Sequence, residues 1–147
     1  MLVLALITAV GCTAPPPAHT TPARSPLDAR ATLEAFFEAW RAKDKAALEP
    51  LLVEDRRDGD AWGFEELDRI EFGAITEAPG EVADYLEHGR GSVSGVAADD
   101  VAVFRANATF YFKPGVRGPV ASGATQDWKW VLVRGADGVW RIDDWGY

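Results

Sequence analysis

The C-terminal stretch, residues 125–147, most constrains the fold of this chain: T-Q-D-W-K-W-V-L-V-R-G-A-D-G-V-W-R-I-D-D-W-G-Y. It contains four of the six tryptophans. Two segments that alternate between apolar and polar residues flank the turn sequence G-A-D-G. Alternation with a period of two is typical of β-strands, and glycine-containing turns join antiparallel strands. The stretch therefore predicts a β-hairpin with one tryptophan-rich face.

The second strand of this hairpin carries the residue with the most chemical interest, Asp144. Strict alternation places Asp144 on the same face as Trp140 and Ile142, and places Asp143 and Trp145 on the opposite face. An inward carboxylate among tryptophans is a candidate general base. The structural alternative is that Asp144 accepts hydrogen bonds from a tryptophan or a backbone amide and fixes the chain end.

An amphipathic helix is expected over residues 26–42, because Leu33, Phe36, Phe37 and Trp40 form one apolar stripe. Ser25 and the proline that follows it fit a helix cap with proline in the first helical position. Asp44 can cap a second short helix with inward leucines at 48, 51 and 52.

A first strand is predicted at residues 69–77 and a long strand at 99–113. The long strand has a wholly apolar face, made of Ala102, Phe104, Ala106, Ala108, Phe110 and Phe112. Between these strands, residues 81–88 fit a short helix, and G-R-G-S-V-S-G resembles a loop. The helices and strands together predict an α+β domain with N-terminal helices packed across a mainly antiparallel sheet.

The N-terminal region predicts that the protein is located outside the cytoplasm. Residues 1–11 are apolar and too short to span a bilayer, and they fit a secretion signal. The sequence A-V-G-C that ends at Cys12 resembles the lipobox of bacterial lipoproteins, in which the cysteine carries a diacylglyceryl anchor. Residues 12–26 are rich in proline and threonine, as a solvated tether would be, and the folded domain spans residues 27–147. The alternative is an apolar tail with a chance cysteine.

Charge and composition argue against several classes of function. The 23 acidic residues against 15 basic ones, a formal net charge of −8, disfavour direct binding to nucleic acid. With two histidines and one cysteine, no metal site and no cofactor are expected. Glu54, Asp58 and Glu65 match positions of a calcium loop, but Arg56 occupies a ligand position, so an acidic solvated loop is expected. Trp62 and Phe64, in the same stretch, are predicted to fold over the core.

The order of elements resembles the nuclear transport factor 2-like, cystatin-like superfamily, in which a long helix crosses a curved sheet that forms a cone. The ending W-x-W-V-L-V-R at residues 128–134 and D-G-V-W-R-I-D-D-W-G-Y at 137–147 is similar to a family of small bacterial lipoproteins of unknown function in that superfamily. The resemblance implies a cone over residues 27–147, enclosing a pocket. It also matches Asp144 to the position where isomerase-like and dehydratase-like members carry an Asp or His.

Three functions follow as hypotheses. The first is a non-enzymatic lipoprotein on the bacterial cell membrane that binds a small apolar ligand or a protein partner in a pocket lined by Phe36, Trp40, Phe104, Trp128, Trp130, Trp140 and Asp144. The second is a small isomerase, dehydratase or hydrolase with Asp144 as general base. The third is an interaction domain that forms a homodimer through the mixed sheet face of Arg105, Asn107, Thr109 and Tyr111.

Overall fold

The structure is a computed structural model that describes residues 28–57 and 63–146. Cys12, Ser25, Asp58 and Trp62, and the predictions made for them, lie outside the described residues. The helices are α1 (Ala29–Arg41), α2 (Lys45–Leu48), α3 (Val82–His88) and α4 (Gly91–Ser94), with the 3₁₀ helices η1 (Glu49–Leu51), η2 (Glu54–Arg56), η3 (Pro79–Glu81) and η4 (Ala98–Asp100). The strands are β1 (Leu67–Phe72), β2 (Thr76–Glu77), β3 (Val101–Phe112), β4 (Thr125–Arg134) and β5 (Trp140–Gly146).

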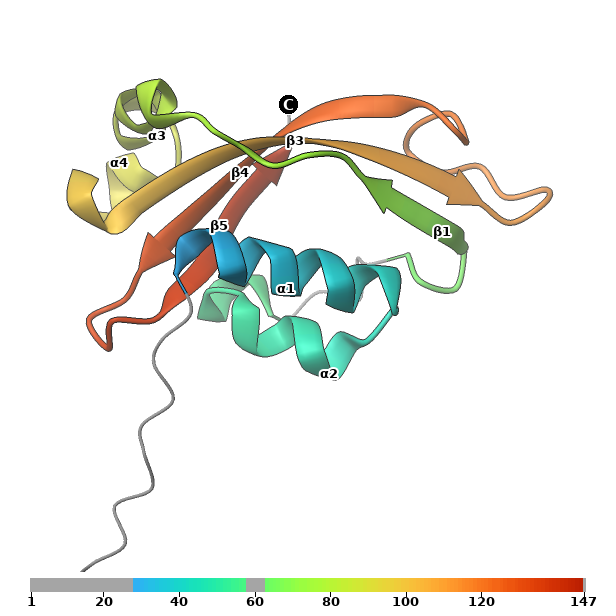
Figure 1. Cartoon of the computed structure of the whole chain (residues 1–147), viewed down its shortest axis with the longest axis horizontal. Helices are drawn as coiled ribbons and strands as arrows, with labels where there is room; N and C mark the ends of the chain where they lie inside the picture. Colours follow the sequence, from blue (N-terminus) through green and yellow to red (C-terminus); the bar gives the residue numbers. More distant parts are fainter. Residues whose placement is uncertain (1–27, 58–62, 147) are drawn as a thin grey trace, which may run out of the picture.

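The strands form one antiparallel sheet in the order β1-β3-β4-β5, and β2 also pairs with β3. The sheet curls strongly and arches over α1, while α3 and α4 lie at one end on its convex side (Figure 1). This arrangement confirms the predicted α+β class, with helices across a curved sheet of cone-like curvature. None of the helices in the described ranges has the length and apolar character needed to cross a bilayer.

Helix α1 begins at Ala29, three residues later than the sequence predicted. Asp28 has an extended backbone, and its carboxylate accepts a hydrogen bond from the Ala31 amide at 2.7 Å. An N-cap residue leaves the helical conformation, so Asp28 fixes the start of the helix. The prediction at the next helix is confirmed, because the Asp44 carboxylate caps α2 through the Ala47 amide at 3.1 Å.

Aromatic side chains fill the space between α1 and the concave face of the sheet. Phe36 and Trp130 are fully buried, and Trp40 is 5 % exposed. The ring centroids of Phe36 and Trp130 lie 5.9 Å apart, and those of Trp40 and Trp130 lie 6.2 Å apart, both edge-on. The small residues Ala106 and Ala108 on β3 are buried in the same cluster, as tight packing against a helix requires. Phe64 packs partly buried against this core, as predicted.

The first predicted strand is interrupted, because β1 ends at Phe72 and β2 begins at Thr76. Between them the amide of Gly73 donates to the carbonyl of Asn107 at 2.8 Å. The loop expected at G-R-G-S-V-S-G is also wrong in part, since residues 91–94 form α4. Tyr85 of α3 is buried against valines of β3 and β4, so a second, smaller core covers one end of the convex face.

The convex face that was considered for dimer formation is charged, and its ion pairs lie within the chain. Arg105 donates to both carboxylate oxygens of Glu81, at 2.8 and 3.0 Å, and pairs with Asp127 at 3.4 Å. Asn107 is exposed, Tyr111 is half-buried, and Thr109 bonds to Thr125 at 2.8 Å. A homodimer through this face stays a prediction.

We expect Trp130→Ala to destabilise the domain severely, because Trp130 is fully buried at the centre of the ring cluster. Removal of a buried aromatic side chain costs about 3–5 kcal/mol of unfolding free energy. Val93→Ala is the control, because the Val93 side chain is 87 % exposed and its removal should change stability by less than about 0.5 kcal/mol. Urea unfolding followed by fluorescence measures both variants, and similar losses would contradict the central role of Trp130.

Candidate functional site

A β-bulge at Asp143 changes the register of the final strand. Leu132 pairs with Ile142 and Val131 pairs with Asp144, so Asp143 is an extra residue in β5. One inserted residue reverses the alternation of all residues that follow it. The predicted inward orientation of Asp144 is therefore wrong, and Trp145 takes the inner face instead, opposite Trp130. The Trp145 ring lies 6.2 Å from the Phe36 ring, centroid to centroid.

Asp144 is held in an ion pair at the edge of β5. Its carboxylate accepts a hydrogen bond from the Arg56 guanidinium at 2.8 Å, and both side chains are about one-third exposed, at 35 % and 31 %. The same guanidinium donates to the backbone carbonyl of Asp143 at 3.0 Å and lies over the Trp145 ring at 5.3 Å. Arg56 therefore fastens η2 along the bulged part of the strand.

The extra residue, Asp143, forms the centre of a polar cluster, buried at Tyr85 and Asp143 and open to solvent at Asp55, which we call the bulge network (Tyr85, Arg90, Asp143 and Asp55). Asp143 is 5 % exposed, and it accepts hydrogen bonds from the Tyr85 hydroxyl at 2.6 Å and from the Arg90 Nε at 3.1 Å. Arg90 also donates to the Asp55 carboxylate in η2. The network links the convex-side helices, the bulge and η2 across sequence separations of up to 58 residues.

Burial and hydrogen bonding shift the pKa values of Tyr85, Arg90 and Asp55 in the bulge network. Burial, followed by the hydrogen bond to Asp143, raises the pKa of Tyr85 well above its usual value of 10.0. Hydrogen bonds to Asp55 and then to Asp143 raise the pKa of Arg90. The hydrogen bond from Arg90 lowers the pKa of Asp55. Tyr85 is 1 % exposed, so the network is sealed from solvent at its centre and acts as a structural clamp.

Two features of the sequence point to this network, although alternation alone missed it. The inward residues Ile142 and Trp145 are three positions apart, an odd spacing that a regular strand cannot place on one face. Glycines at 89 and 91 flank Arg90, and a Cβ added at Gly91 would lie 2.7 Å from the Tyr85 ring. Only glycine lets the backbone pass that close to the tyrosine.

The residues predicted to line a pocket are distributed over three places. Phe36, Trp40 and Trp130 are core residues, and half-buried Trp128 packs on Trp130 with a centroid distance of 5.5 Å. Trp140 is half-buried at the start of β5, with the Arg134 guanidinium 5.3 Å from its ring. Phe104 is 4 % exposed and contributes to the wall of a surface cleft, apart from Asp144.

This surface cleft, which we call the N-terminal cleft, has a volume of about 410 Å³ and lies where α1 begins beside the start of β3. Its walls are mostly apolar, and its two carboxylate residues, Asp28 and Glu77, are exposed at its mouth. It is lined by Asp28, Ala29, Arg30, Glu77, Pro79, Val82, Val101, Ala102, Val103 and Phe104. The sequence did not predict this cleft, because its walls come from four separate segments. Alternation and helical periodicity predict each segment alone and do not show how the segments meet.

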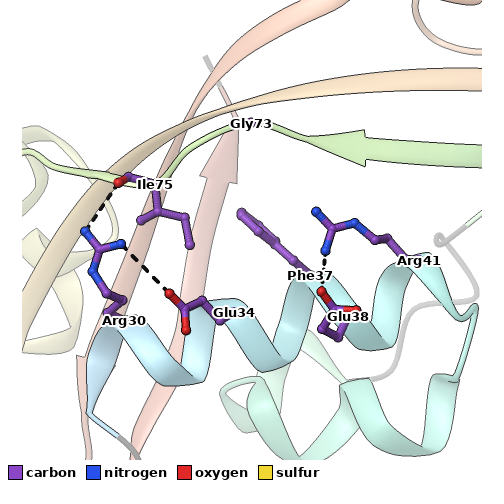
Figure 2. Close-up of a pocket in the computed structure, with 7 residues that line it drawn as sticks. All are labelled: Arg30, Glu34, Phe37, Glu38, Arg41, Gly73 and Ile75. Carbon is purple, nitrogen blue, oxygen red and sulfur yellow. Dashed lines mark hydrogen bonds and ion pairs between the residues drawn. The ribbon is translucent and has the colours of Figure 1, made fainter.

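A second hollow of about 230 Å³ runs between α1 and the segment that joins β1 to β2 (Figure 2). Its lining is mainly charged, with Glu34, Glu38 and Arg41 on α1 facing Gly73 and Ile75. Arg30 lines both hollows, donates to the Ile75 carbonyl at 3.3 Å and lies 3.9 Å from Glu34. Arg30 therefore separates the mainly charged hollow from the mainly apolar cleft.

Among residues 28–57 and 63–146, no group of three or more His, Cys, Asp or Glu side chains is arranged to hold a metal ion. Within those same ranges, the carboxylates of β5 are engaged by arginines and a tyrosine. Of the two hollows described above, the N-terminal cleft is the larger, and its volume of about 410 Å³ falls in the range of small-molecule sites.

We expect the Tyr85 hydroxyl to make the stability of the domain pH-dependent in the alkaline range. The folded-state pKa of Tyr85 is raised, so its contribution is complete below pH 10 and is lost as the pH rises through the folded-state pKa. Above about pH 10, the unfolding free energy should fall by about 1.4 kcal/mol more per pH unit in the parent chain than in Tyr85→Phe. Tyr111→Phe, at a half-buried tyrosine on β3, is the control. Urea unfolding between pH 8 and 11 measures the difference, and parallel curves would contradict it.

Comparison with known proteins identifies a family but no function. No curated protein and no solved structure matches the chain. A family model described as "Domain of unknown function (DUF4829)" matches residues 30–146, which include α1 from its second residue, the sheet, the bulge network and most of the N-terminal cleft. The chain therefore belongs to the DUF4829 domain family.

Proposed function

We propose that this chain is a non-enzymatic, lipid-anchored binding protein outside the bacterial cytoplasm, and that its ligand is a small apolar molecule held in the N-terminal cleft. The observation that carries this proposal is the cleft itself, with about 410 Å³ of space against the side chains of Val82, Val101 and Phe104. Concave sites of several hundred Å³ with apolar walls and a few polar groups are typical of small-molecule binding.

The ring core between α1 and the sheet is a poorer candidate for the ligand site. Phe36, Trp40 and Trp130 are 0–5 % exposed and contact one another edge-on. A ligand there would have to displace packed aromatic rings, each of which contributes about 1.5–3 kcal/mol through burial. The open cleft needs no such rearrangement.

The alternative of an isomerase, dehydratase or hydrolase depends on Asp144 as a base. In the folded chain this carboxylate is bonded to Arg56 and lies off the inner face of the sheet. A general base must reach the proton that it removes. We therefore favour the binding function over the enzymatic one.

The proposed location outside the cytoplasm rests on the N-terminal sequence. The proposed relationship to the nuclear transport factor 2-like superfamily rests on the C-terminal motif. The lipobox-like A-V-G-C at Cys12 and the tether over residues 12–26 would hold the domain clear of the membrane. The curled sheet across α1 is compatible with the cone of that superfamily (Figure 1).

Binding in the cleft is tested with octanol, an apolar ligand that is used below its solubility limit with ¹⁵N-labelled chain. We expect shifts of the amide resonances of Val82, Val101 and Ala102, because these residues line the cleft. Val82→Phe should weaken binding at least about threefold, since the larger side chain occupies cleft volume. Val93→Phe is the matched control, because Val93 is 87 % exposed and does not line the cleft. Shifts confined to other parts of the domain, or an unaffected Val82→Phe, would contradict the proposal.

Lipidation is tested by mass spectrometry of the native protein. Processing at the lipobox should remove residues 1–11 and leave a mass increase of a diacylglyceryl group on Cys12. Cys12→Ser should abolish both changes and release the chain from the membrane fraction. An unmodified Cys12 in an uncleaved chain would refute the proposed anchor.

A further inference from the structure

The charged residues at the mouth of the N-terminal cleft suggest which class of apolar ligand it takes. Two carboxylates, Asp28 and Glu77, line the cleft, together with one guanidinium, Arg30. Arg30 is already engaged by the Ile75 carbonyl at 3.3 Å and lies 3.9 Å from the Glu34 carboxylate. The mouth therefore has an excess of negative charge that the arginine does not neutralise.

Glu77 and Asp28 differ in the hydrogen bonds that their carboxylates make within the folded chain. The Asp28 Oδ1 atom caps α1, and a carboxylate has a second oxygen that can accept a further bond. Glu77 is exposed in the short strand β2, and within the described ranges its carboxylate makes no hydrogen bond and no ion pair. Glu77 is thus the group at the mouth that is best placed to meet a charged ligand.

The aromatic wall of the cleft also tolerates a cation. The Arg30 guanidinium lies 5.9 Å from the centroid of the Phe104 ring, within the range of cation–π attraction. The formal net charge of −8 adds a long-range field that attracts cations and repels anions. A fatty acid carboxylate would meet like charge from Asp28 and Glu77 at the mouth.

We infer that the N-terminal cleft binds amphiphilic cations, with an aliphatic chain along Val82, Val101 and Phe104 and an ammonium group beside Asp28 and Glu77. This inference rests on the proposed function, because it names the ligand class of the same cleft. The apolar walls contact the aliphatic chain whatever the charge of the head group. The carboxylates at the mouth distinguish a cationic head group from a neutral or an anionic one.

The test compares three probes of equal chain length, octyltrimethylammonium, octanol and octanoate, with the full chain and below micelle-forming concentrations. NMR titration should give octyltrimethylammonium a Kd about threefold to tenfold lower than that of octanol, as one or two exposed charge pairs would produce. Octanoate should bind more weakly than octanol. Added salt should weaken binding of the cation and leave octanol unchanged.

Isosteric variants test whether the two carboxylates cause the preference for the cationic probe over octanol. Glu77→Gln and Asp28→Asn should each raise the Kd of the cation about twofold to fivefold and leave that of octanol unchanged. Asparagine is as good a helix cap as aspartate, so Asp28→Asn keeps α1 intact. Glu87→Gln makes the same change in net charge at an exposed position of α3 that does not line the cleft, and it should have no effect.

The outcomes separate the ligand class from the function. If the three probes bind equally, or if Glu77→Gln and Asp28→Asn match Glu87→Gln, the cationic class is overturned while the cleft remains an apolar site. If no probe shifts the resonances of the cleft, the proposed function fails together with this inference.

Discussion

The rest of the structure depends on a single extra residue in the last strand. The bulge at Asp143 turns Trp145 toward the helix and leaves a carboxylate on the convex side of the sheet, where a buried charge has to be compensated. Tyr85 and Arg90 provide that compensation, and both come from the α3–α4 region. The position of the small helices on the convex face thus follows from an irregularity in β5.

The same irregularity explains why the fold could be predicted from the sequence while the site could not. The apolar stripe of α1 and the alternation of β3 each reflect a single period, and both elements lie where those periods place them. Asp144 was assigned by extending the alternation through Ile142, which holds only until a residue is inserted. The start of α1 shows a similar limit of prediction. Ser25 and Asp28 are both suitable N-cap residues, and the sequence alone does not decide which of them caps the helix.

The N-terminal cleft illustrates a second limit of sequence reasoning. Phe104 was predicted to line a pocket together with tryptophans inside the cone, but it contributes instead to the wall of the surface cleft, where its neighbours are Val82 and Glu77. The five tryptophans of the described residues belong to the core or pack against it, where large rings fill the space under the curled sheet. The aromatic residues of this chain therefore indicate how the space under the curved sheet is filled, and the N-terminal cleft lies beyond that packed region, at the start of α1.

The two margins of the sheet are closed by different means. Leu52 forms a parallel bridge with Ile142, and the Val53 amide donates to the Ile142 carbonyl at 3.0 Å, so the chain itself lines the outer side of β5. On the opposite margin, the break between β1 and β2 interrupts the edge, and the Arg30 guanidinium donates a hydrogen bond to the Ile75 carbonyl. Within residues 28–57 and 63–146, neither margin offers the long, straight row of backbone groups that templates strand addition from another molecule. Copies of the domain at high local concentration would in this way resist polymerising edge to edge.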